Sequence, residues 1–164
     1  MTESTISGNS AVGAGGVTIG SNHVTVKNST ISNNSATGDG GGVLIDNSRP
    51  FFVSSIIANN TGSSGPDCFT VAGDFPPDVL ISEGFNLIQD TSGCVIKGVT
   101  AGNIYGMDPM LGPLQDNGGP TFTQALLPGS PAIDAVTVPS RCRGTDQRGV
   151  TRTTPCDIGA YESQ

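Results

Sequence analysis

The side chains with the strongest chemistry in this chain are four cysteines and a single histidine, His23. Four cysteines can pair in three ways. A zinc site would need closely spaced Cys and His ligands, but the sequence has no Cys-x-x-Cys pair and offers one histidine. The cysteines therefore predict disulfides rather than a metal site, and disulfides favour an extracytoplasmic location.

The carboxylates show no arrangement typical of catalysis. A glycoside hydrolase needs two carboxylates at a defined separation, and a polysaccharide lyase needs acidic Ca²⁺ ligands beside a base. Asp39 lies in a glycine-rich turn and Asp46 follows an apolar run, so they fall at different phases of one sequence repeat. The turn around Asp39 resembles a Gly/Asp calcium turn but occurs once, which leaves Ca²⁺ as a minor alternative. We expect no catalytic residue, no cofactor and no metal.

The first half of the chain repeats every 25 to 26 residues. Three eight-residue segments align with one another, and two glycine-led blocks align at the same period. The segments are 4–11, 29–36 and 55–62, and the blocks are 15–19 and 41–45. A period of this size is typical of stacked solenoid coils. A leucine-rich frame and a 3.6-residue periodicity are both missing, which leaves short strands separated by turns.

Equivalent residues of this repeat should stack on one another in neighbouring coils. An inner ladder is predicted for Ile6, Ile31 and Ile57. A second ladder, of stacked amides just after the same strand, is predicted for Asn9, Asn34 and Asn60. We expect these asparagines to occupy a left-handed corner, which Asn tolerates, and to hydrogen-bond along the stack. The sequence therefore predicts an all-β chain folded as a parallel β-helix.

The repeat also suggests how the cysteines pair. Cys68 and Cys94 are 26 residues apart, which is one coil. Equivalent positions on neighbouring coils lie about 4.8 Å apart, within reach of a disulfide. Cys142 and Cys156 enclose a short loop near the end of the chain. We predict the disulfides Cys68–Cys94 and Cys142–Cys156.

The remainder of the chain resembles a known bacterial family. The matching phrases are DPMLGPLQDNGGPTFTQALLPGSPAIDA (108–135) and GTDQRGVTR (144–152) with CDIGAYE (156–162). These phrases resemble the C-terminal region of right-handed parallel β-helix surface proteins of the choice-of-anchor Q type, which are related to polymorphic outer-membrane-protein repeats. The resemblance implies coils in 1–103 and a capping region in 104–164 that closes the open end of the stack.

The composition of the chain limits the kinds of partner that we expect it to bind. The net charge is −7 and the sequence pI is about 4.3, so a nucleic-acid partner is not expected. No run approaches the roughly 20 apolar residues of a membrane span. The repeat starts by Ser4 without an opening cap or a leader pattern, so we expect further coils and the export signal upstream. The Pro-containing segment 74–78 is expected to leave the coil.

These features favour a non-catalytic structural or adhesion module of a secreted or cell-surface bacterial protein. Its expected contacts are extracellular polysaccharide or a host or cell surface. A polysaccharide-binding or polysaccharide-degrading fragment (lyase or hydrolase) is the alternative. Ice binding is a lesser alternative, because no regular threonine ladder continues from Thr5, Thr18, Thr25 and Thr30.

Overall fold

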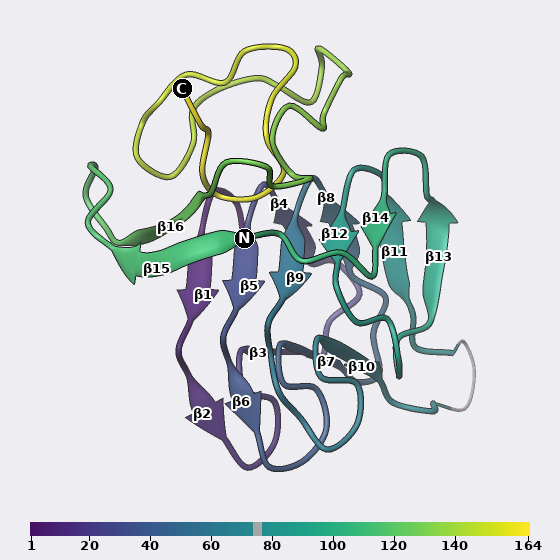
Figure 1. Ribbon diagram of the computed structural model, residues 1–164. Coiled ribbons are helices and arrows are strands. Elements are labelled where there is room, and N and C mark those ends of the chain that lie inside the picture. The colour runs from purple at the N-terminus through teal and green to yellow at the C-terminus, as the bar shows by residue number, and fades with distance from the viewer. Residues whose placement is uncertain (74–76) are drawn as a thin grey trace.

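The computed structural model describes residues 1–73 and 77–164, and every regular element within them is a β-strand (Figure 1). The strands that pair in parallel are β1 Thr5–Ser7, β2 Ser10–Ala11, β3 Val17–Ile19, β4 Thr25–Lys27, β5 Thr30–Ser32, β6 Ser35–Ala36, β7 Val43–Ile45, β8 Phe51–Val53, β9 Ile56–Ala58, β10 Cys68–Thr70, β11 Leu80–Glu83, β12 Leu87–Ile88, β13 Ile96–Val99 and β14 Ile104–Tyr105. An antiparallel pair follows, β15 Leu111–Gln115 and β16 Thr123–Leu126. The predicted all-β class is therefore confirmed. No helix capable of spanning a bilayer occurs in this described part of the chain.

The chain runs through three parallel sheets in turn. Their strand orders are β1-β5-β9-β12-β14, β3-β7-β10 and β4-β8-β11-β13, and the short pair β2-β6 lies between visits to the first two. We call one run of the chain through these sheets a pass. Each strand hydrogen-bonds to the equivalent strand of the next pass, so Ile31 lies between Ile6 and Ile57. Val17 lies beside Val43 in the same way. The sequence repeat is therefore the separation between hydrogen-bonded neighbours.

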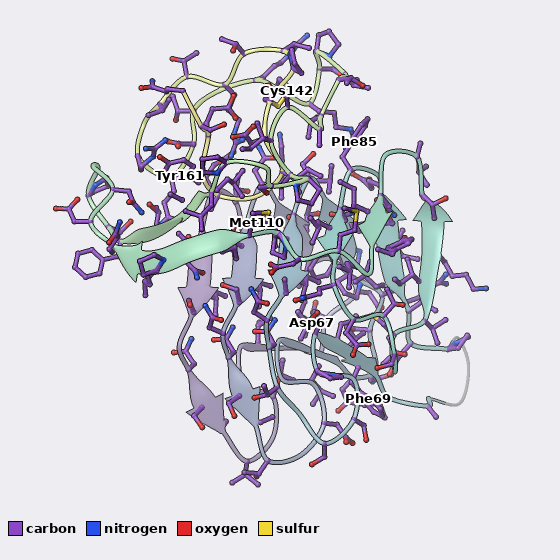
Figure 2. All side chains as sticks on the ribbon, viewed as in Figure 1. Asp67, Phe69, Phe85, Met110, Cys142 and Tyr161 are labelled. Atoms are coloured by element: carbon purple, nitrogen blue, oxygen red, sulfur yellow. A yellow bond between two sulfur atoms is a disulfide. The ribbon has the colours of Figure 1, made fainter. Side chains whose placement is uncertain are left out.

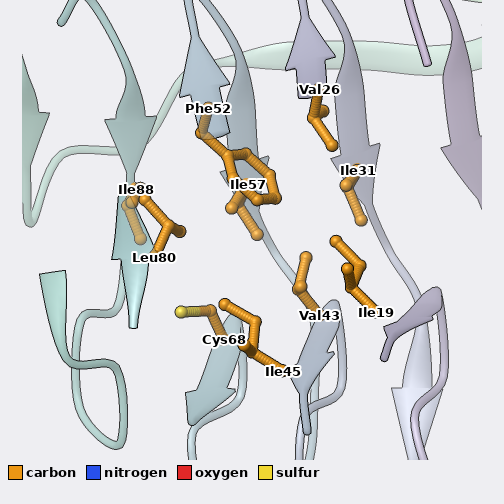
Figure 3. Close-up of a cluster of buried hydrophobic side chains, with 10 residues drawn as sticks. All are labelled: Ile19, Val26, Ile31, Val43, Ile45, Phe52, Ile57, Cys68, Leu80 and Ile88. Carbon is orange, nitrogen blue, oxygen red and sulfur yellow. The ribbon is translucent and has the colours of Figure 1, made fainter. Parts of the chain in front are cut away.

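Apolar side chains from all three sheets pack into one inner core (Figure 3). Its buried members are Ile19, Val26, Ile31, Val43, Ile45, Phe52, Ile57, Cys68, Leu80 and Ile88. In β7, Val43 and Ile45 are buried while Leu44 is partly exposed, because successive side chains of a strand point to opposite faces. Burial of such a side chain is worth about 1.5–3 kcal/mol, so these rows are the main source of stability.

The passes change length after β9. Ile81 pairs with Phe51 of the pass before it and with Lys97 of the pass after it. Lys97 is much closer to Ile81 in the sequence than Phe51 is, so the last pass is much the shorter. The chain goes from β12 to β13 without adding a strand to the β3-β7-β10 sheet. Instead, Gly93 O accepts a hydrogen bond from Thr70 N at 2.9 Å. Residues 74–76 of the predicted excursion lie outside the described residues.

The C-terminal region, residues 106–164, packs on the outer side of the five-stranded sheet, where β15 and β16 cross in front of its strands (Figure 1). Ile56, Ala58 and Leu87 point away from the inner core. They form a second apolar cluster with Leu126, Ala132, Val136, Cys142, Cys156 and Ile158. We expected this region to close an end of the stack. It covers a lateral face instead, because β9 and β12 carry apolar side chains on both sides.

The contact between the C-terminal region and the sheet is close. A Cβ added at Gly159 would lie 2.8 Å from both Ile56 Cδ1 and Thr30 Oγ1. Thr30 Oγ1 accepts a hydrogen bond from Ala160 N at 3.1 Å, and Ser32 bonds Gln124. Strand β14, at the start of the predicted capping region, still pairs with β12 in the parallel sheet.

Candidate functional site

Both predicted disulfides are present, and no described cysteine is free. Cys68 on β10 bonds Cys94 in the turn before β13, with the two Cα atoms 5.4 Å apart. Cys142 bonds Cys156 within the C-terminal region, with the two Cα atoms 5.7 Å apart. Two disulfides are compatible with an extracellular protein.

The predicted asparagines hydrogen-bond to one another along the stack. Asn9 Nδ2 donates to Asn34 Oδ1 at 2.9 Å, and Asn34 Nδ2 donates to Asn60 Oδ1 at 3.0 Å. Asn60 Nδ2 then donates to Asp67 Oδ1 at 2.9 Å. Burial raises the pKa of Asp67, although its hydrogen bonds from Asn60 and Asp90 act in the opposite direction. The sequence reading missed Asp67, which ends this ladder and directly precedes Cys68.

The left-handed corner lies one residue before each ladder asparagine. Gly8, Asn33 and Asn59 have φ values of 74°, 55° and 59°. The expectation that Asn9, Asn34 and Asn60 themselves take up this backbone was therefore wrong. Their side chains serve as acceptors and donors between passes, while the preceding residue makes the corner.

A second polar ladder stabilises the corner before the five-stranded sheet. In each step, a backbone N–H donates to the side-chain oxygen of the next pass, at 2.8 to 3.3 Å. The ladder consists of Ser4, Ser29, Ser55, Asn86 and Asn103. The sequence reading did not identify it. Its only signal is a Ser or Asn directly before the strand residues of every pass.

An ion-paired cluster joins the C-terminal region to the first pass. The buried guanidinium of Arg152 donates to Glu3 Oε2 at 2.9 Å and to Glu162 Oε2 at 3.0 Å. It also donates to the carbonyl oxygens of Asp157 and Gly159. Burial raises the pKa of Glu3 and of Glu162, because it outweighs the attraction of the single cation that they share. We call Glu3, Arg152 and Glu162 the clamp.

A second ion pair lies next to the clamp. Arg148 pairs with Asp146 at 2.8 Å, and its guanidinium lies 3.6 Å from the ring centre of Tyr161, which Figure 2 labels in the C-terminal region. Burial alone would raise the pKa of Asp146. Hydrogen bonds from Glu162 N, Val150 N and Arg148 outweigh this effect and lower the pKa. The carboxylates of the clamp and of Asp146 therefore already serve as structural hydrogen-bond acceptors.

The carboxylates considered for catalysis stay apart from this cluster. Asp39 and Asp46 lie before and after β7, and Asp46 is exposed. Asp39 pairs through its backbone with Ser64, and His23 is exposed in the turn before β4. Within residues 1–73 and 77–164, no group of three or more His, Cys, Asp or Glu side chains is placed to hold a metal ion.

The outer face of the β4-β8-β11-β13 sheet carries an open groove. The groove has a volume of about 420 Å³ and is lined by Asn22, Arg49, Phe51 and Ile81. Phe51 on β8 pairs with Ile81 on β11, so their side chains stand next to each other on this face. The lining is mainly apolar, with a guanidinium and an amide at hand, which suits a ligand that presents both apolar and charged groups.

A second hollow lies on the C-terminal region beside the clamp. Its volume is about 640 Å³. It is lined by Leu126, Pro128, Ile133, Asp134, Thr153, Tyr161, Ser163 and Gln164. The carboxylate of Asp157 lies next to this hollow and accepts hydrogen bonds from Asp134 N and Ser163 Oγ. These bonds give the buried carboxylate a structural role.

Comparisons of the chain with protein-family models, with curated proteins and with solved structures found no match.

Proposed function

We propose that this chain is a non-catalytic structural or adhesion module of a secreted or cell-surface bacterial protein, folded as a right-handed parallel β-helix. The resemblance of residues 108–162 to choice-of-anchor Q surface proteins supports the bacterial and surface assignment. The two disulfides support export. The chain passes through three parallel sheets, and its first passes keep hydrogen-bonded neighbours 25 to 26 residues apart, which supports the β-helix.

The proposal rests mainly on one observation, which is that the buried acids accept hydrogen bonds from the backbone. Asp67, Asp78, Asp146, Asp157 and Glu162 are buried, and each accepts hydrogen bonds from backbone N–H groups of other segments. Acids that are buried and accept backbone N–H groups hold segments together and lie out of contact with a bound substrate. These buried hydrogen bonds stiffen the stack of parallel strands, which suits display or adhesion.

The alternatives have weaker support. Degradation of polysaccharide would need two facing carboxylates, and Asp39 and Asp46 lie at opposite ends of β7. Ice binding would need a free threonine face, but Thr30 is buried and Thr5 bonds Gln147 beneath the C-terminal region. Polysaccharide binding without turnover is compatible with the open groove.

The test measures turnover and rigidity together. The chain with intact disulfides is incubated with a pool of acidic and neutral polysaccharides, with and without Ca²⁺, and new reducing ends and unsaturated uronides are quantified. A parallel sample is exposed to a broad-specificity protease. We expect no product above a heat-treated control, and a stack that resists cleavage. Product formation, or rapid cleavage within residues 1–73 or 77–105, would overturn the proposal.

A further inference from the structure

The basic residues of the parallel part of the chain gather on one face. Within residues 1–103 the lysines and arginines are Lys27, Arg49 and Lys97. Lys27 lies on β4, Arg49 lies just before β8, and Lys97 lies on β13. Lys27 and Lys97 therefore belong to the β4-β8-β11-β13 sheet, and Arg49 lines the groove on its outer face, although the chain as a whole carries a net charge of −7.

Strand alternation directs these side chains outward. Val26, Phe52 and Leu80 of this sheet point into the inner core. Their neighbours Thr25, Phe51 and Ile81 consequently face outward, and register places Lys97 beside Ile81. The outer row formed by Thr25, Phe51, Ile81 and Lys97 crosses four strands and spans about 14 Å at the usual strand spacing.

The positive charges on this face are available to a ligand. Glu83 is the outward-facing acid of β11, and it is already paired with Arg141 at 3.5 Å. In the part of the chain that the structure describes, no carboxylate lies within ion-pair distance of Arg49 or Lys97. Lys27 lies at the border of the face, where its positive charge favours the ionised form of Glu3. Arg49 therefore lines the groove with Phe51 and Ile81, and Lys97 lies next to Ile81 on the neighbouring strand.

We propose that this outer face binds an anionic polysaccharide. Arg49 and Lys97 would contact its acidic groups, Arg49 with the planar fork that matches a carboxylate. The exposed ring of Phe51 and the side chain of Ile81 would contact the apolar faces of the sugar rings. This inference rests on the proposed adhesion function and names its ligand.

A polysaccharide fits the face better than the other polyanions. Duplex DNA carries dense charge and is bound by many basic contacts, whereas this face offers few and the whole chain is acidic. An anionic membrane attracts polybasic clusters, which this row is not. A chain of sugars with spaced acidic groups needs only scattered cations and an apolar strip between them.

The experiment measures binding of the full chain to polygalacturonate by affinity electrophoresis and titration calorimetry, with dextran as the neutral control. The variants are Arg49→Ala, Lys97→Ala and their double, and Arg143→Ala is the matched control because Arg143 is exposed in the C-terminal region. We expect the double variant to bind about tenfold more weakly, with unchanged binding by Arg143→Ala and weaker binding at high salt. Phe51→Ala should weaken binding while leaving the salt dependence unchanged.

Thermal unfolding of each variant shows that the fold is retained. Equal binding by the double variant, no binding to polygalacturonate, or stronger binding to dextran, to duplex DNA or to vesicles of anionic phospholipid would each overturn the inference. None of these outcomes affects the proposed structural or adhesion role, which fails only on turnover or on rapid cleavage of the stack.

Discussion

Arg152 and Glu3 form an ion pair with an N–O distance of 2.9 Å although 149 residues separate them in the chain. The pair joins the first pass of the stack to the C-terminal region. Glu162 completes the clamp from the other side of the same guanidinium. Removal of the cation would leave the buried carboxylate of Glu162 and the partly buried carboxylate of Glu3 without their shared partner.

We predict that Arg152→Ala lowers the free energy of unfolding by about 3–5 kcal/mol, because it strands the carboxylates of the clamp without their cation. Urea unfolding followed by circular dichroism measures the change. Arg143→Ala removes an exposed arginine and should change the stability by less than about 0.5 kcal/mol. If Arg152→Ala does not fold, Glu3→Gln provides the milder test. Equal effects of the two arginine variants would contradict a structural clamp.

The asparagine ladder makes a graded prediction. Asn34 is buried and bonds to Asn9, Asn60 and Ile6 O, so Asn34→Ala should cost about 1–3 kcal/mol through the groups it leaves unpaired. Asn9 ends the same ladder in an exposed position, so Asn9→Ala, the identical chemical change, should cost less than Asn34→Ala. Thermal and urea unfolding of both variants compare the costs. A larger cost at Asn9 would show that the ladder does not act through buried hydrogen bonds.

Asp67 makes a prediction about pH. Burial raises its pKa above the ordinary 3.8, so between pH 3.8 and the folded pKa the folded state binds a proton more strongly than the unfolded state does. The stability from this group is complete below 3.8 and is lost as the pH rises through the folded pKa. Asp67→Asn removes this component and, at every pH, loses the acceptor for Asp90 N.

We therefore expect the difference in unfolding free energy between the Asp67→Asn variant and the natural chain to move in favour of the variant as the pH rises from 3.8 through the folded pKa. Urea unfolding at a series of pH values measures the difference. A difference that stays constant would contradict a raised pKa, and one that moves in favour of the natural chain would mean that the pKa is lowered.

The disulfide Cys142–Cys156 should hold the C-terminal region against the sheet. Its replacement by two serines is expected to cost about 3 kcal/mol, as is usual for a loop of this size. The change should expose residues 128–164 to protease, while residues 1–73 and 77–105 stay protected. Limited proteolysis with mass spectrometry locates the first cuts. The matched double variant of Cys68 and Cys94 should leave the C-terminal region uncut, since that bond lies in the stack. First cuts at the same place in both variants would argue against separate roles.

The sequence by itself determined the strands and much of their stacking. Ile6, Ile31 and Ile57 recur at one period and lie beside one another, because a parallel ladder turns a sequence period into a spatial neighbour. The same period places Cys68 near Cys94. The corner was misplaced by one residue, since the pattern repeats equally at Asn33 and Asn34 and does not say which of the two takes a positive φ.

Only the tertiary structure decided what covers each face. Ile56, Ala58 and Leu87 show by their type that the outer side of the five-stranded sheet is buried, but not by what. The ion pair of Glu3 with Arg152 and the hydrogen bond of Asn60 with Asp67 are single contacts between non-repeating residues. The placement of Lys97 beside Ile81 is another. Such contacts leave no periodic signal, because each is made once and its partners are brought together only when the chain packs.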